Sequence, residues 1–298
     1  MSKLEKSTCA IVVTYNRLAL LKQCLDKLLN QSEPVSHIVV VNNKSTDGTT
    51  SYLNALKNPK VLVLNMSENL GGAKGFNTGM KYAFQKTQDN FFWIMDDDTF
   101  PDEDALRELL KAEQDLHAEV GFLCSNVRWK DGQTTNIPAV ASRWSEKIDS
   151  GIVKVETATF VSVMVSRRVV RELGLPTAAL FIWGDDTEFT TRLSAKYPCY
   201  FVTNSHVLHF SEKNISDVTV ENDSLNRLSR YRYMYRNLIF IDKKYHSKKK
   251  MIKRILGNLI SALLILFKSH DHRFKRSGVI LSGTFKGLIF NPKTEYVK

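Results

Sequence analysis

The chain has 298 residues, of which 43% are apolar, and its 42 Lys and Arg outnumber 31 Asp and Glu for a formal net charge of +11. This apolar fraction supports a large buried core and excludes a disordered chain. The four cysteines show no CxxC or Cys/His spacing, which argues against a zinc site and predicts buried thiols in a reducing compartment. The polar N-terminus lacks the apolar core of a signal peptide, and no apolar run reaches the ~18 residues of a membrane span.

The positive charge is concentrated at one end of the chain. Residues 227–298 contain 18 Lys and Arg against 3 Asp and Glu, whereas residues 1–226 contain 24 against 28. At this length we expect either one large α/β domain with an appendage or two modest domains. In both cases a slightly acidic front precedes a strongly basic tail.

Apolar, β-branched runs alternate with amphipathic segments along the first half of the chain. Strands are predicted at residues 8–13, 37–41, 61–64, 91–95 and 121–125, and helices at 18–29, 50–56 and 102–116. Further strands are predicted at 155–165 and 200–203, with helices at 167–173 and from the acidic cluster near 185 to about 196. Strands and helices alternating at this spacing predict a parallel sheet with helical crossovers.

Three carboxylates, Asp96, Asp97 and Asp98, follow the fully apolar strand predicted at residues 91–95. They fall in a strand-to-helix loop, and ligands of open α/β sheets bind beyond the carboxyl ends of the strands. Adjacent carboxylates repel one another unless a cation or a donor-rich ligand is present. The pattern therefore favours a hard divalent cation shared with a diphosphate, and the alternative is a solvated acidic turn that caps the next helix.

The segment at residues 69–79 is rich in glycine, with Gly71, Gly72, Gly75 and Gly79. It matches neither the Rossmann fingerprint nor the Walker pattern. Two interpretations stay open at this point. One is tight packing of a helix on the sheet, and the other is a loop that faces a ligand.

A second acidic cluster contains Asp185, Asp186 and Glu188 at the start of a predicted helix. One aspartate is enough to cap a helix, so the additional carboxylates suggest a general base in the same crevice as the first cluster. Further along, His206 and His209 lie among apolar residues. Such histidines are usually packed or on the surface, but a neutral imidazole here would add a nitrogen ligand to a carboxylate-bound cation.

The basic tail begins with a predicted helix at residues 225–241 that is dense in Arg and Tyr, which either bind phosphate and sugar or form one packed and one wet face. Lysines then flank an apolar run at 255–267, and a second apolar stretch covers 278–290. These runs are too short to cross a bilayer but suit helices in a membrane interface. Binding to an anionic membrane surface is favoured over nucleic acid, because the interleaved residues are aliphatic. A dimer interface is the other alternative.

Six motifs in order, VVTYNR, VNNKSTDGT, NLGGAKGFNTG, WIMDDD, WGDDTE and YMYRN, resemble the inverting nucleotide-sugar-dependent glycosyltransferases of the GT-A fold, in family 2. The nearest likeness is to the bacterial galactofuranosyltransferase and rhamnosyltransferase branch. The resemblance implies an α/β, Rossmann-like, mainly parallel sheet flanked by helices. It implies a catalytic domain at 1–224, with a nucleotide-binding half to about 125 and an acceptor half from about 126. A helical basic region at 225–298 follows.

The resemblance also implies roles for individual residues. Asp96, Asp98 and His209 would bind Mn²⁺ or Mg²⁺, and Asp186, with Asp185 beside it, would be the catalytic base. Residues in the nucleotide site would be Thr14, Tyr15, Arg17, Asn42, Asn43, Gly72 and Asp97. Trp183 and Glu188 would contact the acceptor. With one base and no second nucleophile, the reaction would be a single displacement that inverts the anomeric carbon.

Two departures from the family pattern bear on the donor. Asn42 stands where the second motif usually has a carboxylate, and Phe76-Asn77 replaces the common Arg-Asn, as in the galactofuranosyl and rhamnosyl branch. The triple aspartate looks more like the galactofuranosyl enzymes than the rhamnosyl ones, which favours UDP-galactofuranose over dTDP-rhamnose or another UDP-hexose.

The expected setting is the building of a bacterial cell-surface polysaccharide on a lipid-linked or oligosaccharide acceptor. We expect the protein in the cytoplasm, peripheral on the inner face of the cell membrane, with no nucleic-acid partner and with oligomer formation left open. The alternatives from another class are a nucleotidyltransferase and a non-catalytic membrane scaffold.

Overall fold

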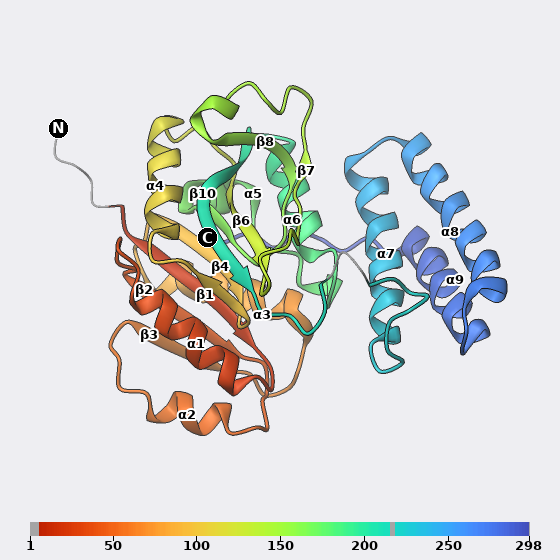
Figure 1. The fold of residues 1–298 in the computed structure, drawn as a ribbon, viewed down its shortest axis with the longest axis horizontal. Helices are drawn as coiled ribbons and strands as arrows, with labels where there is room; N and C mark the ends of the chain where they lie inside the picture. Colours follow the sequence, from red (N-terminus) through yellow and green to blue (C-terminus); the bar gives the residue numbers. More distant parts are fainter. Residues whose placement is uncertain (1–5, 215–217, 298) are drawn as a thin grey trace.

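The computed structural model describes residues 6–214 and 218–297. Its described residues form one mixed sheet of ten strands in the order β3-β2-β1-β4-β9-β6-β10-β8-β7, with β5 paired to β10 (Figure 1). The strands are β1 Thr8–Thr14, β2 His37–Asn42, β3 Val61–Asn65, β4 Phe91–Asp96, β5 Thr99–Pro101, β6 Leu123–Trp129, β7 Ala139–Val140, β8 Ile152–Thr157, β9 Val163–Ser166 and β10 Cys199–His209. The first four strands are parallel, which confirms the predicted α/β class.

Helices cover both faces of the parallel part because β1 and β4 carry apolar side chains on both sides. The helices are α1 Leu18–Leu29, α2 Thr49–Ala55, α3 Gly71–Lys86, α4 Ala105–Asp115, α5 Arg167–Leu173 and α6 Asp185–Ser194, with short 3-10 turns at Ile148–Ser150 and Ala178–Leu180. One core cluster joins the sheet to α1 and α4, and the other joins it to α3, α5 and α6. The resulting three layers are those of a doubly wound α/β domain.

The glycine-rich segment forms the start of α3, and two of its glycines let that helix approach the sheet closely. A Cβ added at Gly75 would come within 2.6 Å of a Val13 methyl, and one at Gly79 would come within 2.8 Å of Ile11 and Val41. At Gly75 and Gly79 the glycines therefore serve tight packing of the helix on the sheet, which is the first of the two interpretations. Gly72 differs, because no atom lies within 4 Å of an added Cβ there.

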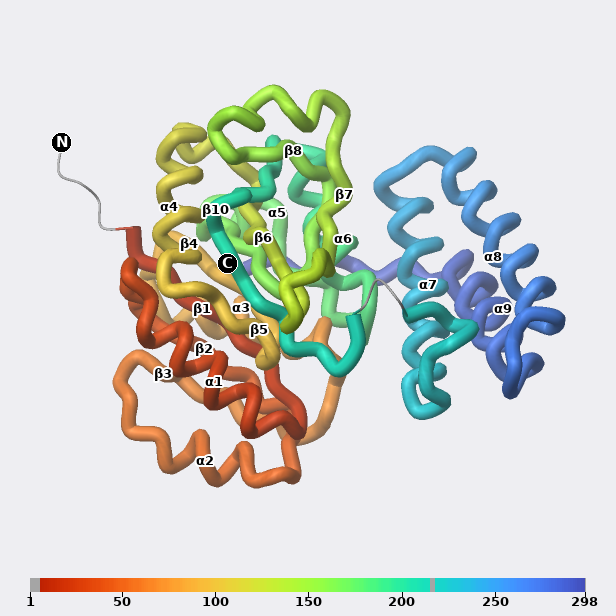
Figure 2. Tube along the Cα trace, in the orientation of Figure 1, coloured from red at the N-terminus to blue at the C-terminus, as the bar shows by residue number. Residues whose placement is uncertain are grey.

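Three sequence predictions need correction in the second half of the sheet. The predicted strand at 155–165 is two strands, because β8 pairs with β10 whereas β9 pairs with β4 and β6. The short strand predicted at 200–203 is the first part of an eleven-residue strand, β10, whose register shifts between Val202 and His206. The three-residue strand β5 was not predicted at all, and Figure 2 places it beside the end of β10.

The basic tail forms three helices that pack against one another at one side of the sheet, α7 Leu228–Tyr245, α8 Lys248–Lys268 and α9 Arg273–Ile289 (Figure 1). After α9 the chain returns to the α/β unit formed by the sheet and α1 to α6, which is called the catalytic unit once its activity has been established below. There Glu295 accepts hydrogen bonds from Asn77 and Lys81, and Val297 is buried with the α3 and α5 side chains. Among the described residues, no helix is both long and apolar enough to cross a membrane.

Candidate active site

The polar strand ends predicted from the sequence meet at one edge of the sheet. Thr14, Asn42 and Asp96 are the last residues of β1, β2 and β4, and these parallel strands are neighbours in the sheet. Parallel strands end at the same edge, so the loops that follow them line a common crevice. This edge is where the candidate site lies.

Asp96, Asp98 and His209 form a group whose potential ligand atoms all lie within 4.8 Å of one another. The small strand β5 explains how a histidine 111 residues after Asp98 reaches it. Antiparallel pairing of β5 with β10 sets His209 opposite Thr99, and the backbone N–H of Phe210 donates to the carbonyl oxygen of Asp98 at 2.8 Å. The sequence predicted the three residues, and the strand pairing brings them together.

The orientation of His209 is fixed from behind by a residue that the sequence analysis did not identify. Its Nδ1 lies 2.8 Å from Asn136 Oδ1, which leaves Nε2 facing Asp98 Oδ1 at 3.3 Å. Asp98 Oδ1 is buried and has no hydrogen-bond partner among the described residues. Two carboxylates, one imidazole and an unsatisfied buried oxygen fit a divalent cation, because a bound cation would satisfy that oxygen.

Burial and neighbouring charges shift the pKa values of the three aspartates in different directions. Burial, followed by the charges of Asp98 and Asp97, raises the pKa of Asp96. Burial raises the pKa of Asp97 to about 6, against the opposing charge of Arg17. Burial likewise opposes ionisation of Asp98, but the close contact with His209 and the charges of His209 and Arg17 outweigh it and hold the pKa of Asp98 below its usual value.

Asp97 has a different position from its two neighbours. Its carboxylate is buried, accepts a hydrogen bond from Thr14 Oγ1 at 2.7 Å and pairs with Arg17 at 3.3 Å. Arg17 also pairs with Asp98. Thr14, Arg17 and Asp97 therefore tie the end of β1 to the end of β4, beside the metal-ligand group.

Asn42, the last residue of β2, and Asn43, which follows it, are buried, and their side-chain amides form hydrogen bonds within the protein. Asn42 Nδ2 donates to Thr50 and to Asn65, each at 2.8 Å, and its Oδ1 accepts from the Ser45 backbone. Asn43 likewise bonds to the loop before α3, through Asn69, Leu70 and Gly71. In this structure both amides hold the loops at this edge, so the exposed candidates for nucleotide contact are Tyr15, which is 46% exposed, and Arg17. Gly72 is partly buried, but there is open space where its side chain would be.

The second acidic cluster begins helix α6. Gly184, in the left-handed conformation at φ 91°, precedes Asp185 and Asp186, whose carboxylates lie at the positive end of the helix. Burial, followed by the charge of Asp186, raises the pKa of Asp185 to about 8, and burial also raises the pKa of Asp186. The charge of Asp185 in turn contributes to raising the pKa of Asp96. The loop before α6 also reaches this edge of the sheet, because the backbone N–H of Ala73, at the start of α3, donates to the carbonyl oxygen of Phe181 at 3.1 Å.

The loop that leads to Asp185 is held by α7, a contact that the sequence analysis missed. Asn237 is fully buried, and its Nδ2 contacts the carbonyl oxygens of Leu180 at 3.0 Å, Ile182 at 3.3 Å and Trp183 at 2.6 Å. Two non-glycine residues of this loop have left-handed backbones, Phe181 at φ 67° and Trp183 at φ 57°. Such conformations persist only where surrounding contacts impose them, and the Asn237 amide supplies those contacts.

The aromatic and basic residues of the YMYRN region pack rather than stand free. Tyr233 stacks on Phe181 at 4.7 Å between ring centres, and Tyr231 meets Trp183 edge-on at 4.9 Å. Arg236 donates to the carbonyl oxygens of Ala179 and Leu180, each at 3.0 Å. Of the two interpretations of this helix, packing therefore describes these residues.

Glu188 does not have the surface position that an acceptor contact requires. It is fully buried, pairs with Arg192 at 3.1 Å, and accepts hydrogen bonds from Thr177 and Tyr245. The acceptor role is therefore corrected to a structural one that joins α6 to α7. Trp183 is only partly buried at the mouth of the loop, beside the Arg227 guanidinium at 5.7 Å from its ring centre.

Comparisons with known proteins agree with this geometry. The model of the protein family described as "Glycosyl transferase family 2" matches residues 9–174 of this chain. Over 201 residues the chain is 28% identical to galactofuranosyltransferase GlfT1 of Mycolicibacterium smegmatis, covering 62% of this chain and 64% of that protein. It is 29% identical over 201 residues to GlfT1 of Mycobacterium tuberculosis, covering 64% and 65%. The matches thus span just under two thirds of these relatives.

Solved structures share the fold at low sequence identity. GalNAc-T7 with UDP, GalNAc and Mn²⁺ superposes with a TM-score of 0.65 at 12% identity over 93% of this chain and 54% of that one. The Pyrobaculum calidifontis mannosyltransferase PcManGT, in complex with GDP-Man and Mn²⁺, superposes with a TM-score of 0.56 at 17% sequence identity. This superposition covers 95% of this chain and 87% of PcManGT. The expected fold is thereby confirmed. Because the family match covers more than half of its length, this chain belongs to glycosyl transferase family 2 and is a glycosyltransferase with the GT-A fold.

Proposed function

We propose that the protein is an inverting galactofuranosyltransferase that uses UDP-galactofuranose. The observation that carries this proposal is the Asp96, Asp98 and His209 group at the edge of the sheet. Asp185 and Asp186 are proposed to face this group, which is supported by the contact of the loop before α6 with the start of α3. The choice of sugar is supported by the similarity to the two mycobacterial galactofuranosyltransferases. The same crevice would also accept dTDP-rhamnose or another UDP-hexose, so the donor is the first property to test.

Asp96, Asp98 and His209 are proposed to hold Mn²⁺ or Mg²⁺. A divalent cation bound there would supply positive charge that offsets the negative charge developing on the leaving nucleotide diphosphate. Arg17 lies beside the same carboxylates and adds a fixed positive charge. We place the nucleotide against Tyr15 and Gly72, where the surface is open, while Thr14, Asn42, Asn43 and Asp97 fix the loops around it.

Asp186 is proposed as the general base. It would take the proton of the acceptor hydroxyl while that oxygen attacks the anomeric carbon from the face opposite the diphosphate. One displacement inverts the configuration, and the departing nucleotide takes the electron pair of the broken glycosidic bond. The raised pKa of Asp186, caused by burial, suits a base that must bind a proton during the reaction. Trp183, at the mouth of the same loop, is the proposed acceptor wall.

The proposed acceptor is a lipid-linked or oligosaccharide chain of a bacterial cell-surface polysaccharide, which places the enzyme on the cytoplasmic face of the membrane. We propose residues 1–224 as the catalytic domain, divided near residue 125, and 225–298 as the helical basic region. This domain division is supported by one packing cluster whose buried residues come mostly from α7, α8 and α9.

A panel of nucleotide sugars tests the proposal. The full chain is incubated with Mn²⁺ and UDP-galactofuranose, UDP-galactopyranose, UDP-glucose or dTDP-rhamnose, with short galactoside acceptors, and released UDP or dTDP is measured. The expected result is acceptor-dependent release from UDP-galactofuranose only. Release from dTDP-rhamnose alone would replace the proposed donor, and cleavage of none of them with any acceptor would favour the non-catalytic scaffold.

A further inference from the structure

The last two helices have an unusual distribution of side chains. The buried face of α8 includes Asn258, whose Nδ2 donates to Thr284 Oγ1 of α9 at 2.9 Å. The buried face of α9 contains Arg276, Ser277, Gly283, Thr284 and Gly287, with Ile280 as its one large aliphatic residue. Soluble helices normally bury their large apolar residues. Here most of the packed face is small or polar.

Glycine spacing explains the close packing of α9 on α7. An added Cβ at Gly283 would lie 2.6 Å from the carbonyl oxygen of Arg232, and one at Gly287 would lie 2.6 Å from Ile239 Cβ. These glycines are four residues apart, so both lie on the same side of the helix. Small residues at this spacing let two backbones approach, as in helix pairs that pack inside membranes.

The large apolar side chains of α8 point outward instead. Leu256 is 55% exposed, Leu263 is 59% exposed and Phe267 is 75% exposed. With Ile252 and Ile260 they recur every three or four residues, and therefore form one stripe opposite the packed face. On α9 the exposed residues Phe274, Phe285 and Ile289 are eleven and four residues apart, so they also lie on one side of their helix. A stripe of this kind is the apolar face of an interfacial helix.

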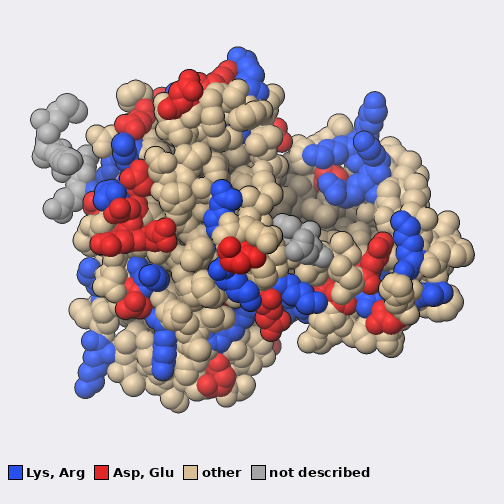
Figure 3. Space-filling model, viewed as in Figure 1, with Lys and Arg blue, Asp and Glu red and all other residues tan. Residues whose placement is uncertain are grey.

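Basic residues lie at both ends of the α8 stripe. Lys248, Lys249, Lys250 and Lys253 lie in its first turns, and Lys268 lies at its end. Residues 248–289 contain ten Lys and Arg and one acidic residue, Asp271. Figure 3 shows blue side chains scattered around the tan surface of these helices. At ~1.5 Å per residue the 21-residue helix is about 31 Å long, so its charged ends and apolar middle could meet a membrane together.

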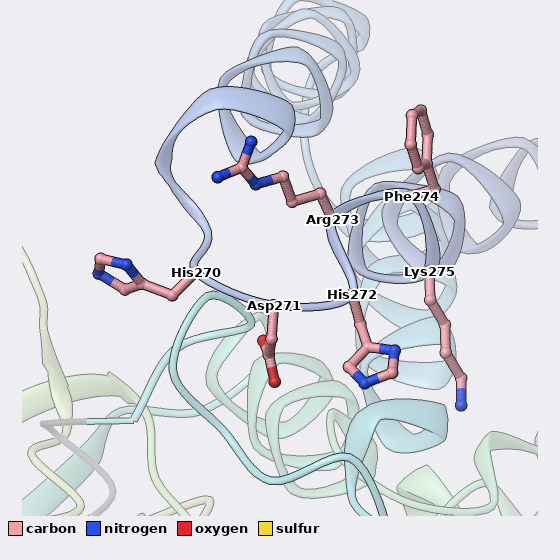
Figure 4. Close-up of a pocket in the computed structure, with 6 residues that line it drawn as sticks. All are labelled: His270, Asp271, His272, Arg273, Phe274 and Lys275. Carbon is pink, nitrogen blue, oxygen red and sulfur yellow. The ribbon is translucent and has the colours of Figure 1, made fainter.

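The turn between α8 and α9 continues this surface. It forms a shallow hollow lined by His270, Asp271, His272, Arg273, Phe274 and Lys275 (Figure 4). Asp271 is paired with Arg276, at 2.6 Å, so the one acidic group of the turn is neutralised. Phe274 is 84% exposed and points away from the turn, whereas the side chain of Lys275 points in the opposite direction (Figure 4).

We propose that the outer faces of α8 and α9 dock the protein onto an anionic lipid surface. Apolar side chains enter the acyl boundary, while the lysines at the ends contact lipid phosphates. A second copy of the chain is a poorer occupant, because two such faces would set basic ends against each other. This inference deepens the proposed function and takes its setting from it, since a lipid-linked acceptor resides at such a surface.

Vesicle sedimentation tests the docking face with the full chain. Vesicles of pure phosphatidylcholine are compared with vesicles containing about one third phosphatidylglycerol. The wild-type protein should pellet with the anionic vesicles and remain in the supernatant with the neutral ones, and added salt should weaken the binding. Equal binding to both vesicle types, or to neither, would overturn the proposal.

The apolar stripe is tested by the triple variant Leu256→Glu, Ile260→Glu and Leu263→Glu. These side chains are exposed, so the fold should persist, as circular dichroism can check. Removing three membrane-inserted aliphatic groups should weaken binding by more than roughly a hundredfold. The matched control changes Ile137, Val140 and Ile148 to Glu, which are 69%, 56% and 41% exposed on the catalytic unit, and it should bind like wild type.

The basic end is tested by changing Lys248, Lys249 and Lys250 to Gln. At about 1 kcal/mol per lysine, binding should weaken roughly a hundredfold. The control changes Lys27, Lys60 and Lys111 to Gln, which are all exposed on the catalytic unit. Its affinity for anionic vesicles should fall much less.

Two further measurements separate the alternatives. Light scattering reports whether the wild-type protein is a dimer and whether the stripe variant is a monomer. If the variant loses the dimer but binds vesicles as the wild type does, the face belongs to a second copy of the chain. Turnover of a soluble acceptor should be unchanged in the stripe variant. Vesicle binding without any turnover would leave the docking proposal standing and remove the proposed function, so the two can fail separately.

Discussion

The catalytic unit and the C-terminal helices distribute polar and apolar residues in opposite ways. In the catalytic unit, β1 and β4 are buried along their length, and acidic groups gather where those strands end. In α8 and α9 most large apolar residues other than Ile265 and Ile280 are exposed or partly exposed, and Asn258, Thr284 and Arg276 are inside. The first pattern concentrates charged groups at one edge of the sheet, as a catalytic site requires. The second presents an apolar surface, as binding to a membrane requires. One helix, α7, connects the two through Asn237.

The largest effect should come from removing the metal site. Asp98→Asn keeps the shape of the side chain but removes a charge from the group with Asp96 and His209. Transfer should fall to background, and Mn²⁺ binding measured by calorimetry should disappear, because one of the anionic ligands is lost. Vesicle binding should be unaffected in the same preparation. Retained metal-dependent transfer would show that the ion binds elsewhere.

Asp186→Asn should be the next largest change. Loss of the general base should lower kcat roughly a hundredfold to ten-thousandfold. Metal-dependent UDP binding should remain close to wild type, because the variant removes only the proton acceptor. If UDP binding disappears as well, Asp186 belongs to the nucleotide site and its assigned role is wrong.

Asn237→Ala tests the connection between the two regions. Without the amide, the loop at Phe181 and Trp183 loses the contacts that hold its left-handed backbone, so Asp186 should be displaced. A shift of about 1 Å can cost roughly a hundredfold in rate, so kcat should fall between tenfold and a hundredfold with little change in UDP affinity.

Asn258→Ala is the matched control for that variant. It removes a buried amide of the same helical unit whose partner is Thr284, far from the loop in sequence and contact. Both variants should lower the melting temperature, but only Asn237→Ala should lower kcat. An equal loss of kcat in both would mean that the effect is general destabilisation.

The smallest effect should be on the pH dependence of stability. Burial, followed by the charge of Asp186, raises the pKa of Asp185 to about 8, so the folded state binds a proton that the unfolded state releases near pH ~4. The contribution of this proton is therefore lost as the pH rises from about 4 to about 8. Asp185→Asn should raise the melting temperature at pH 8 more than at pH 5, measured with chelator present. An equal change at both pH values would contradict the raised pKa.

Several parts of the molecule were readable from the sequence because they depend on local pattern. The apolar runs of β1, β2 and β4 and the periodic helices α1 and α5 lie within a residue or two of their predicted ends. The aspartate triplet and Asp185-Asp186 were recognisable because carboxylates directly after a buried strand or at a helix start have few structural uses. The uneven charge predicted the basic helical region in the same way.

Other features depended on contacts between distant segments. The pairing of β5 with β10 brings His209 to Asp98, yet β5 has only three residues and carries no periodic pattern. Glu188 looked like a site residue, but its pairing with Arg192 and Tyr245 shows that it joins two helices. Whether an asparagine such as Asn237 faces solvent or a loop is decided by which segments pack around it.

The sequence by itself determined the local chemistry of this protein, namely which strands are buried, where the carboxylates stand and which end is basic. Only the tertiary structure decided which of those groups meet, and which face of the last helices is left outside. The physical reason is that strand and helix propensity act over a few neighbouring residues. Strand pairing and helix packing, by contrast, are selected by the burial of surfaces that lie up to hundreds of residues apart.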